Sequence, residues 1–463
     1  MEKDLTNTNN LIKNEIQIIL KTNLPQEFVI ANNIITVPSN YDSDKLNKLV
    51  KKLLRTKNCK KFSFFIENIS LFSDLNSFLQ NNNKEIDLKK ISETGLEIFY
   101  QFELEEPRLV NTIKEDEWIR KIHPRFKQKY DSSNLDYFSV ALFNSEITIY
   151  NKNFEKILKI EDLNKEENYC ELLHDVLFFR PSYSQSDNSD SNILIRASRN
   201  EDYNFEIFSV DLSRSSSKKI YVNRKRNSEY FNSLALNPVD FSYFVAGDTE
   251  GNLKIFKIPE SFVESDKSSS KQPKKKRKTE INELEHENII ENCHSGNEVK
   301  IVKWINNKQM ITSGDDFVVK LWNIHTKTNF ASFNTNYKLT TCIATIGNEN
   351  EKFLTGHEDG TVKLWDSRVN STSGQGRIIS WNAHTNYVSD LSCNPNTDFY
   401  SNNFSSVGYD GNLKIWDVRQ NKNFVYEIRT DSEKNYAVAY NSSDYLLTGG
   451  DSSTVNIFEN KLL

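Results

Sequence analysis

The sequence predicts a mainly β protein in which a seven-bladed β-propeller follows a small α+β domain. The first sign is a repeat, because TGHEDGTVKLWD at 355–366 returns as SVGYDGNLKIWD at 406–417. The second is a constant interval, since seven aromatic residues each follow a polar or acidic turn residue by six positions. Successive aromatic residues are 42 to 66 positions apart, which fits blades of roughly 40–45 residues with loop insertions. The seven pairs are Asn144/Tyr150, Asp202/Phe208, Glu250/Phe256, Asp316/Trp322, Asp359/Trp365, Asp410/Trp416 and Ser452/Phe458.

The repeated segment has the chemistry of a tight turn between two strands. Asp-Gly at 359–360 and 410–411 can adopt the positive backbone angles that a short hairpin requires. The alternating apolar residues that follow, such as Val362 and Leu364, are expected to pack between blades. On these residues and their spacing the chain resembles the WD-repeat family.

Blades four and six contain every member of a polar set that braces such a blade. An imidazole is expected to link the turn aspartate to a hydroxyl and an indole, which satisfies buried polar groups that otherwise cost about 1–3 kcal/mol each. A His/Ser/Asp set also occurs in hydrolase triads, but its recurrence from blade to blade favours the structural role. The two sets are His294, Thr312, Asp316 and Trp322, and His384, Ser406, Asp410 and Trp416.

The segment before the repeats, residues 1–104, is expected to form its own domain, ordered from about residue 14. Two β-rich runs, EIQIIL at 15–20 and FVIANNIITV at 28–37, flank a turn at Pro25. Asp42 and Ser43 then open an amphipathic helical stretch, and further strands are expected at 61–68 and 96–103. This order indicates a β-grasp, ubiquitin-like module.

The propeller is expected over residues 105–463, with the first blade beginning near Trp118. Blade seven shows three strands before Leu463, which would leave an open sheet edge. The segment from Glu106 to Ile113 is placed to supply the fourth strand and close the ring.

An insertion at 261–292 separates blades three and four and contains a compact basic run. It is interpreted as a disordered loop with a nuclear localisation signal. Two alternatives are a solvated run of charge and contact with RNA phosphates, although no aromatic residues lie among the basic ones for base stacking. The run is Lys274, Lys275, Lys276, Arg277 and Lys278.

Composition narrows the class of protein. The net charge of −5 is small, no apolar run approaches the ~18 residues of a membrane span, and the start MEKDLTNTNN lacks the apolar region of a signal peptide. The cysteines show no C-x-x-C pair, which predicts reduced thiols in a cytosolic or nuclear protein. They are Cys59, Cys170, Cys293, Cys342 and Cys393.

Beyond single repeats, the chain resembles the YTM family of eukaryotic ribosome-biogenesis proteins. The segments that match best are FSFFIEN at 62–68 with SLFSDLNSFL after it, ISETGLEIFY at 91–100, EDEWIRKI at 115–122 and AHTNYVSDLSCNP at 383–395. Blades one and two depart furthest, with Phe143-Asn144-Ser145 at the turn.

The resemblance implies a non-enzymatic assembly factor for the large ribosomal subunit, acting in the nucleus, nucleolus and nucleoplasm. Its propeller would bind the block-of-proliferation protein and, with pescadillo, form the PeBoW complex on pre-60S particles. Its ubiquitin-like domain would dock on midasin, an AAA ATPase, which pulls the factor off the particle. No membrane contact and no stably bound cofactor are expected.

The resemblance also assigns a docking residue, Glu93. Its carboxylate would complete, in trans, the coordination of a Mg²⁺ ion in the midasin adhesion site, since this hard ion takes oxygen ligands. Asp87 and Glu97 are less well placed for that role. Taken alone, Glu93 would be an ordinary solvated charge.

A different class of function is a substrate-recruiting subunit of a ubiquitin ligase, but no F-box or adaptor-binding motif is found. An enzyme is disfavoured, because the sequence holds no H-E-x-x-H, P-loop or G-x-S-x-G motif.

Overall fold

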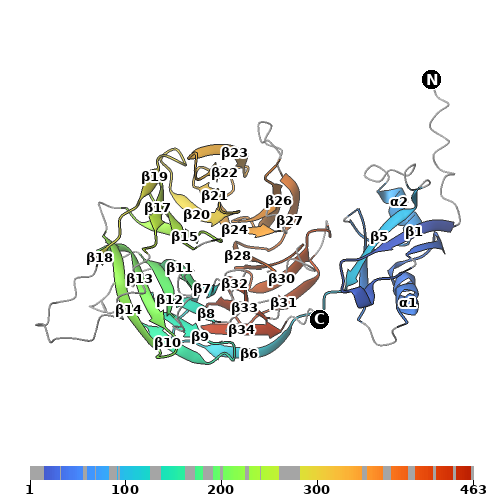
Figure 1. Ribbon diagram of the computed structural model, residues 1–463, viewed down its shortest axis with the longest axis horizontal. Coiled ribbons are helices and arrows are strands. Elements are labelled where there is room, and N and C mark those ends of the chain that lie inside the picture. Colours follow the sequence, from blue (N-terminus) through green and yellow to red (C-terminus); the bar gives the residue numbers. More distant parts are fainter. Residues whose placement is uncertain are drawn as a thin grey trace, which may run out of the picture.

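The computed structural model describes residues 15–31, 33–55, 60–67, 69–82, 91, 94–125, 137–161, 173–180, 191–198, 202–224, 229–239, 241–259, 282–346, 352–368, 377–394, 402–420, 424–441 and 445–459. A small α+β domain lies beside a ring of β-sheets (Figure 1). Within the described residues, no helix has the length and apolar character needed to cross a membrane.

The small domain is a five-stranded sheet in the order β2-β1-β5-β3-β4, with β1 and β5 parallel and the other neighbours antiparallel. This is the strand order of a ubiquitin-like β-grasp. Its strands are β1 (Glu15–Lys21), β2 (Ile34–Pro38), β3 (Phe62–Ile66), β4 (Ile69–Ser70) and β5 (Leu96–Phe102). Its helices are η1 (Gln26–Phe28), α1 (Ser43–Leu53) and α2 (Leu75–Asn81).

Helix α1 begins where the sequence predicts, because the Asp42 carboxylate accepts a hydrogen bond of 2.9 Å from the Lys45 N–H. Leu46 and Val50 are fully buried against the sheet. Asn47, on the same helix, donates to the Phe62 carbonyl at 2.7 Å and accepts from the Phe62 N–H at 2.9 Å. These two bonds tie α1 to β3.

Two features of the small domain differ from the prediction. The run expected as a strand from residue 28 starts pairing only at Ile34, because the Phe28 and Val29 amides bond locally to Pro25 and Gln26 in a 3-10 turn. Helix α2 and the short strand β4 were not predicted. Asp74 caps α2 by accepting from the Ser77 N–H at 3.0 Å.

Seven sheets form the propeller, each with its first strand nearest the centre of the ring (Figure 1). Blade one is β7 (Ile119–Pro124), β8 (Phe138–Leu142), β9 (Ile147–Tyr150) and β10 (Lys156–Ile160). Blade two is β11 (Leu173–Phe179), β12 (Ser191–Ser198), β13 (Tyr203–Asp211), β14 (Ser216–Arg224) and β18 (Asn282–Glu283). Blade three is β15 (Phe231–Leu236), β16 (Tyr243–Asp248), β17 (Leu253–Lys257) and β19 (Asn288–Ile290).

The remaining four blades are regular four-stranded sheets. Blade four is β20 (Val299–Trp304), β21 (Gln309–Gly314), β22 (Val318–Asn323) and β23 (Thr328–Asn334). Blade five is β24 (Thr340–Ile346), β25 (Lys352–His357), β26 (Thr361–Asp366) and β27 (Arg377–Asn382). Blade six is β28 (Val388–Cys393), β29 (Asn403–Gly408), β30 (Asn412–Asp417) and β31 (Tyr426–Arg429). Blade seven is β32 (Asn435–Asn441), β33 (Tyr445–Gly450), β34 (Thr454–Glu459) and β6 (Arg108–Lys114).

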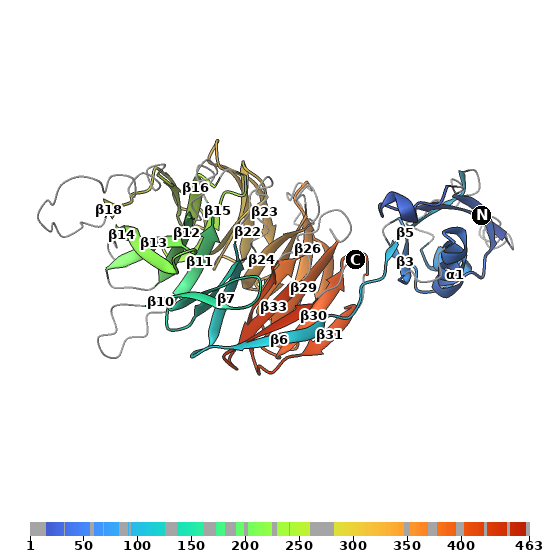
Figure 2. The ribbon, with the colours of Figure 1, turned by 60° about the horizontal axis from the view of Figure 1, so that its bottom comes forward.

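The ring closes through β6, which leaves the small domain and lies along the last blade (Figure 2). It pairs antiparallel with β34, from Thr454 opposite Lys114 to Glu459 opposite Arg108. The apolar residues of blades one and seven form one buried cluster, in which Ile119 packs with Leu447. The seam of the ring is therefore joined by both backbone pairing and apolar packing.

The insertion expected at 261–292 ends earlier than the sequence indicates. Residues 260–281 lie outside the described part of the chain, but β18 and β19 within 282–290 are built into sheets. Strand β19 is the outer strand of blade three, and β18 pairs parallel with β14 of blade two. The prediction missed β19 because its three residues carry no repeat signal, although without it β17 would expose an unpaired edge.

Candidate docking surfaces and the polar networks of the blades

The polar set of blade four is assembled as a chain of hydrogen bonds. The two ring nitrogens of His294 lie 2.8 Å from Asp316 Oδ1 and 2.8 Å from Thr312 Oγ1. Trp322 Nε1 donates to the same hydroxyl at 2.9 Å. The network connects the loop before β20 to β21, the next turn and β22.

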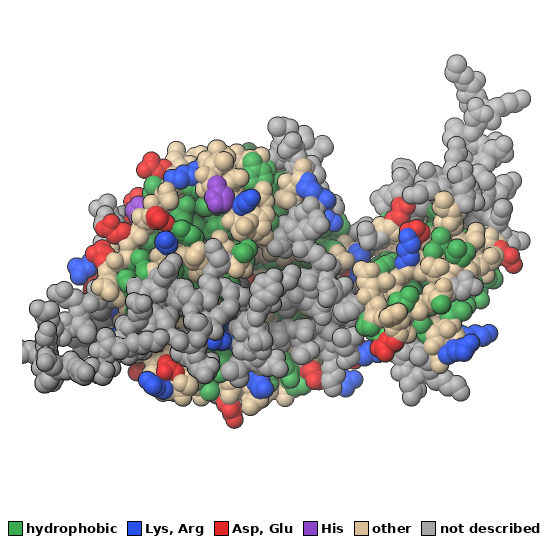
Figure 3. Space-filling view, viewed as in Figure 1, with side chains coloured by type: hydrophobic (Ala, Val, Ile, Leu, Met, Phe, Trp, Pro, Cys, Tyr) green, Lys and Arg blue, Asp and Glu red, His purple; other side chains and the backbone are tan. Residues whose placement is uncertain are grey.

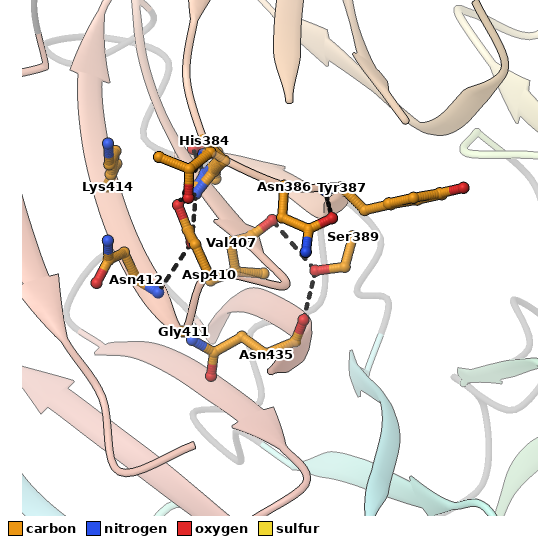
Figure 4. Close-up of polar contacts among 12 residues, drawn as sticks. His384, Asn386, Tyr387, Ser389, Val407, Asp410, Gly411, Asn412, Lys414 and Asn435 are labelled. Carbon is orange, nitrogen blue, oxygen red and sulfur yellow. Dashed lines mark hydrogen bonds and ion pairs between the residues drawn. The ribbon is translucent and has the colours of Figure 1, made fainter. Parts of the chain in front are cut away.

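Blade six repeats the arrangement, and Figure 4 shows His384 beside Asp410. His384 lies 2.9 Å from Asp410 Oδ1 and 2.8 Å from Ser406 Oγ, and Trp416 Nε1 donates to that hydroxyl at 2.9 Å. Burial opposes ionisation of Asp410, but hydrogen bonds from His384 and from backbone N–H groups, that of Thr385 among them, lower its pKa to about 2. The aspartate is therefore a fixed negative charge at neutral pH.

This geometry explains why the His/Ser/Asp set is a brace. A nucleophilic serine must reach a substrate, whereas the Ser406 side chain is wholly buried and already accepts from Trp416. The equivalent position in blade four is Thr312, which is buried in the same way.

Other blades use different buried polar groups, although Asp202 and Glu250 lie in the turns where the interval of six residues places them. In blade three the buried acid is Asp248, which accepts from the Glu250 N–H at 3.0 Å and the Asn252 N–H at 2.7 Å, while Glu250 itself is exposed. In blade two the buried acid is Glu206, paired with Arg196, and not the exposed Asp202. The interval of six residues locates each turn in the sequence. The position of an acidic residue relative to the strands decides whether its side chain is buried.

Blade five takes its histidine from the end of β25. His357 Nε2 lies 2.8 Å from Thr355 Oγ1, which also accepts from Trp365 Nε1 at 2.8 Å. Burial, together with the nearby Lys363 ammonium, lowers the pKa of His357 to about 3. This imidazole is therefore neutral at physiological pH.

The residue assigned to midasin docking, Glu93, lies outside the described part of the chain, as does Asp87. On either side of Glu93, the Gly95 N–H donates to the Ile91 carbonyl at 2.9 Å just before β5. Glu97, on β5, forms an exposed ion pair of 2.6 Å with Lys21. Within the described residues, no group of three or more His, Cys, Asp or Glu side chains could hold a metal ion.

The basic run from Lys274 to Lys278 also falls outside the described residues. Over the described surface in Figure 3, basic and acidic side chains are interspersed. Among the described residues of that face, the picture shows no continuous basic track.

Of the five cysteines, Cys293, Cys342 and Cys393 lie in the described residues, and all three are free thiols. Burial raises the pKa of Cys293 to about 12 and also raises the pKa of the other two. Such thiols are protonated and unreactive at neutral pH. Cys59 and Cys170 lie outside the described part.

The sequence interpretation missed a row of aromatic side chains beside the mouth of the central channel. Neighbouring ring centroids lie 5.1 to 6.0 Å apart along the row. The three tyrosines line a cavity of about 500 Å³. Exposed aromatic surface of this kind is typical of protein interfaces, but it could not be read from the sequence because Tyr436 lies at the start of β32 in blade seven and the other members lie in loops of blades six and one. The row is Tyr387, Tyr409, Tyr436, Phe143 and Trp118.

A second missed feature is the contact between the two domains. Arg419, in the turn after β30 of blade six, lies over the ring of Phe65 in the small domain, with 3.6 Å from Cζ to the ring centroid. Its Nη1 also donates to Gln101 Oε1 at 3.1 Å. No local pattern marks Arg419, because the partners are brought to it by the fold.

Comparison with known proteins finds a matching family model in each of the two domains. Residues 16–79 match the NLE (NUC135) domain, and residues 287–323, 331–366 and 376–417 match the WD domain, G-beta repeat. Over 477 aligned positions the chain is 20% identical to the ribosome biogenesis protein WDR12 homolog of Trichoplax adhaerens, covering 100% of this chain and 99% of the relative. These matches agree with the resemblance to the WDR12/YTM family.

Other WDR12 homologues align in the same way. The protein of that name from Nematostella vectensis is 20% identical over 94% of this chain and 96% of its own length. The one from Drosophila pseudoobscura pseudoobscura is 26% identical over 165 residues, which are 35% of this chain and 37% of the relative. The identity to these relatives is therefore low, while the alignments with the Trichoplax and Nematostella proteins span nearly all of both chains.

Proposed function

We propose that this chain is a non-enzymatic assembly factor in ribosome biogenesis, acting on the large subunit in the nucleolus and nucleoplasm. The observation that carries the proposal is the end-to-end alignment with two ribosome biogenesis proteins, combined with an NLE domain in front of a closed propeller. The buried polar sets of the blades support a scaffold, because their reactive groups are used internally.

In this proposal the propeller holds a partner protein. The family resemblance makes that partner the block-of-proliferation protein, with pescadillo as the third member of the PeBoW complex on pre-60S particles. The exposed aromatic row offers an apolar contact on one face of the propeller, with Trp118 47% and Tyr387 41% exposed. Cross-linking of the assembled complex would identify the blades that contact the partner.

The small domain is proposed to dock on midasin, with Glu93 as the carboxylate that joins the Mg²⁺ ion held by the ATPase. Its support is the family resemblance around Ile91-Ser92-Glu93-Thr94-Gly95 and the position of this segment at the start of β5. A carboxylate is required because Mg²⁺ prefers oxygen ligands.

The test is Glu93→Gln, with Glu97→Gln as the matched control four residues away. We expect Glu93→Gln to abolish Mg²⁺-dependent pull-down of the midasin adhesion domain and to leave the protein trapped on sedimenting pre-60S particles. Glu97→Gln removes an exposed ion pair with Lys21 and should change neither. Equal binding by Glu93→Gln and the parent chain would disprove the assignment of this residue.

The alternative from another class, a substrate receptor of a ubiquitin ligase, makes a separate prediction. Affinity purification of the full chain followed by mass spectrometry should recover pre-60S factors. Recovery of ligase subunits without them would favour the alternative.

A further inference from the structure

In two consecutive blades the third strand ends in the same Asp-x-Arg turn, but only one of the two arginines is buried. In blade five, Arg368 Nε and Nη2 donate to the Asp366 carboxylate at 2.9 and 2.7 Å. In blade six, Arg419 Nε and Nη2 donate to Asp417 at 2.8 and 2.5 Å. The Arg368 side chain is 58% exposed, whereas that of Arg419 is 6% exposed.

The difference arises because the small domain covers Arg419. The guanidinium lies flat enough over Phe65 for Cζ to approach the ring centroid to 3.6 Å, and Nη1 donates to Gln101 at 3.1 Å. The Ser70 N–H donates to the Arg419 carbonyl at 3.4 Å. Arg419 is therefore shared between a carboxylate of its own blade and three groups of another domain.

Phe65 and Gln101 belong to the outer face of the small sheet. Their neighbours Phe64, Ile66 and Tyr100 point to the opposite face and form the core with α1, as the alternation of a strand requires. Phe65 nevertheless is only 2% exposed and Gln101 only 6%. Phe65 lies on the face of this small sheet that points away from the core of its own domain. The propeller buries it.

A second contact holds the segment that follows β5. Tyr426 Oη, on β31 of blade six, donates to the Leu104 carbonyl at 2.8 Å. Leu104 is 8% exposed and packs with Val425 and Tyr426. The small domain is thus attached to blade six at two places, in addition to its covalent link through β6.

The chemistry of the contact favours arginine. Asp417 neutralises the guanidinium and orients its plane, so that placing the pair against Phe65 buries no uncompensated charge. A planar guanidinium can stack on a ring and donate sideways at the same time, which a lysine ammonium cannot do. A cavity of about 210 Å³ remains in the seam, lined by Phe65, Gln101 and Asp417 among others. The contact is specific but incompletely packed, as expected for one that opens.

We propose that the outer β3–β5 face of the small domain is an interaction surface, and that its resident occupant is the Asp417–Arg419 turn of blade six. While the turn is in place, this face is closed to other proteins. A partner that needs the face has to displace Arg419, and it would do so most readily with a guanidinium–carboxylate pair of its own. The proposal does not depend on the role given to Glu93.

The test uses the full chain and the glutamates that lie between the domains, Glu103, Glu105 and Glu106. Arg419→Ala should open the contact, which would raise cleavage by a glutamate-specific protease at these sites about tenfold and enlarge the radius of gyration in X-ray scattering. Arg368→Ala is the matched control, because it removes the same aspartate fork from blade five. We expect it to leave cleavage and size unchanged.

A second variant distinguishes loss of the contact between the domains from disruption of blade six. Gln101→Ala lies in the small domain and leaves the Asp417–Arg419 pair intact, yet it should also speed cleavage, by a smaller factor. Combined with Arg419→Ala it should add little, since the bond is already gone. Arg419→Lys should fail to restore protection. Equal cleavage of the Arg419→Ala, Arg368→Ala and parent chains, with equal radii of gyration, would overturn the proposal.

Discussion

Thr454, in the last strand of the chain, is the register partner of Lys114, in the strand that leaves the small domain. The pairing means that the first and last parts of the propeller are one sheet. Blade seven cannot be completed by the C-terminal repeat alone, because β34 would then present an unpaired edge.

Two truncations test this closure. Deleting Met1 through Ile113 removes nearly all of β6, whereas deleting Met1 through Glu103 removes the small domain and leaves β6 in place. We expect the longer deletion to lower the melting temperature of the propeller and promote aggregation, relative to the shorter one. Identical melting curves would show that β6 contributes nothing to closure.

Loss of a blade brace should cost stability. His384→Ala leaves Asp410 and Ser406 without their shared partner in a buried site, so the free energy of unfolding should fall by about 1–3 kcal/mol. His325→Ala, at an exposed position, is the control and should change it by less than about 0.5 kcal/mol. Urea unfolding followed by tryptophan fluorescence compares the two. If the two variants lower the free energy of unfolding equally, the hydrogen-bond network of blade six does not stabilise the fold more than a surface residue does.

The buried imidazole of blade five predicts a pH dependence. Burial first, and then the charge of Lys363, lower the pKa of His357 to about 3, below its usual 6.5. The unfolded chain therefore binds the extra proton from about pH 6.5 downward while the folded chain does not, so stability is complete above pH 6.5 and is lost as the pH falls toward 3. The slope contributed by this one group is at most about 1.4 kcal/mol per pH unit.

His357→Gln should flatten that dependence, because an amide can still bond to Thr355 but does not titrate in this range. The measurement is the free energy of unfolding of both chains between pH 7.5 and 5. If the two curves stay parallel, His357 is not the group responsible.

The basic run is expected to direct nuclear import. Replacing Lys274 through Lys278 by alanine should shift a fluorescently tagged chain toward the cytoplasm, because import receptors read clustered positive charge. The control is Lys308→Ala with Lys327→Ala, two exposed lysines on the propeller surface. Unchanged nuclear fluorescence of the basic-run variant would count against the signal.

The sequence alone determined the number of blades, their order and the outline of the small domain. Turn chemistry at Asp410-Gly411, the aromatic residue six positions after each turn and the capped start of α1 are local signals, and local signals survive in a single sequence. The polar sets of blades four and six could be assigned for the same reason, since each of these two blades carries its own copy at a recognisable spacing.

Only the tertiary structure decided which of two chemically equivalent residues is buried. Arg368 and Arg419 follow the same tryptophan-aspartate turn, yet one is mostly exposed and the other is buried on Phe65. In the same way, β18 joins blade two although it lies in the chain between β17 and β19, two strands of blade three. Both depend on contacts between segments far apart in sequence, where burial is set by what the rest of the fold brings close and not by the residue or its neighbours.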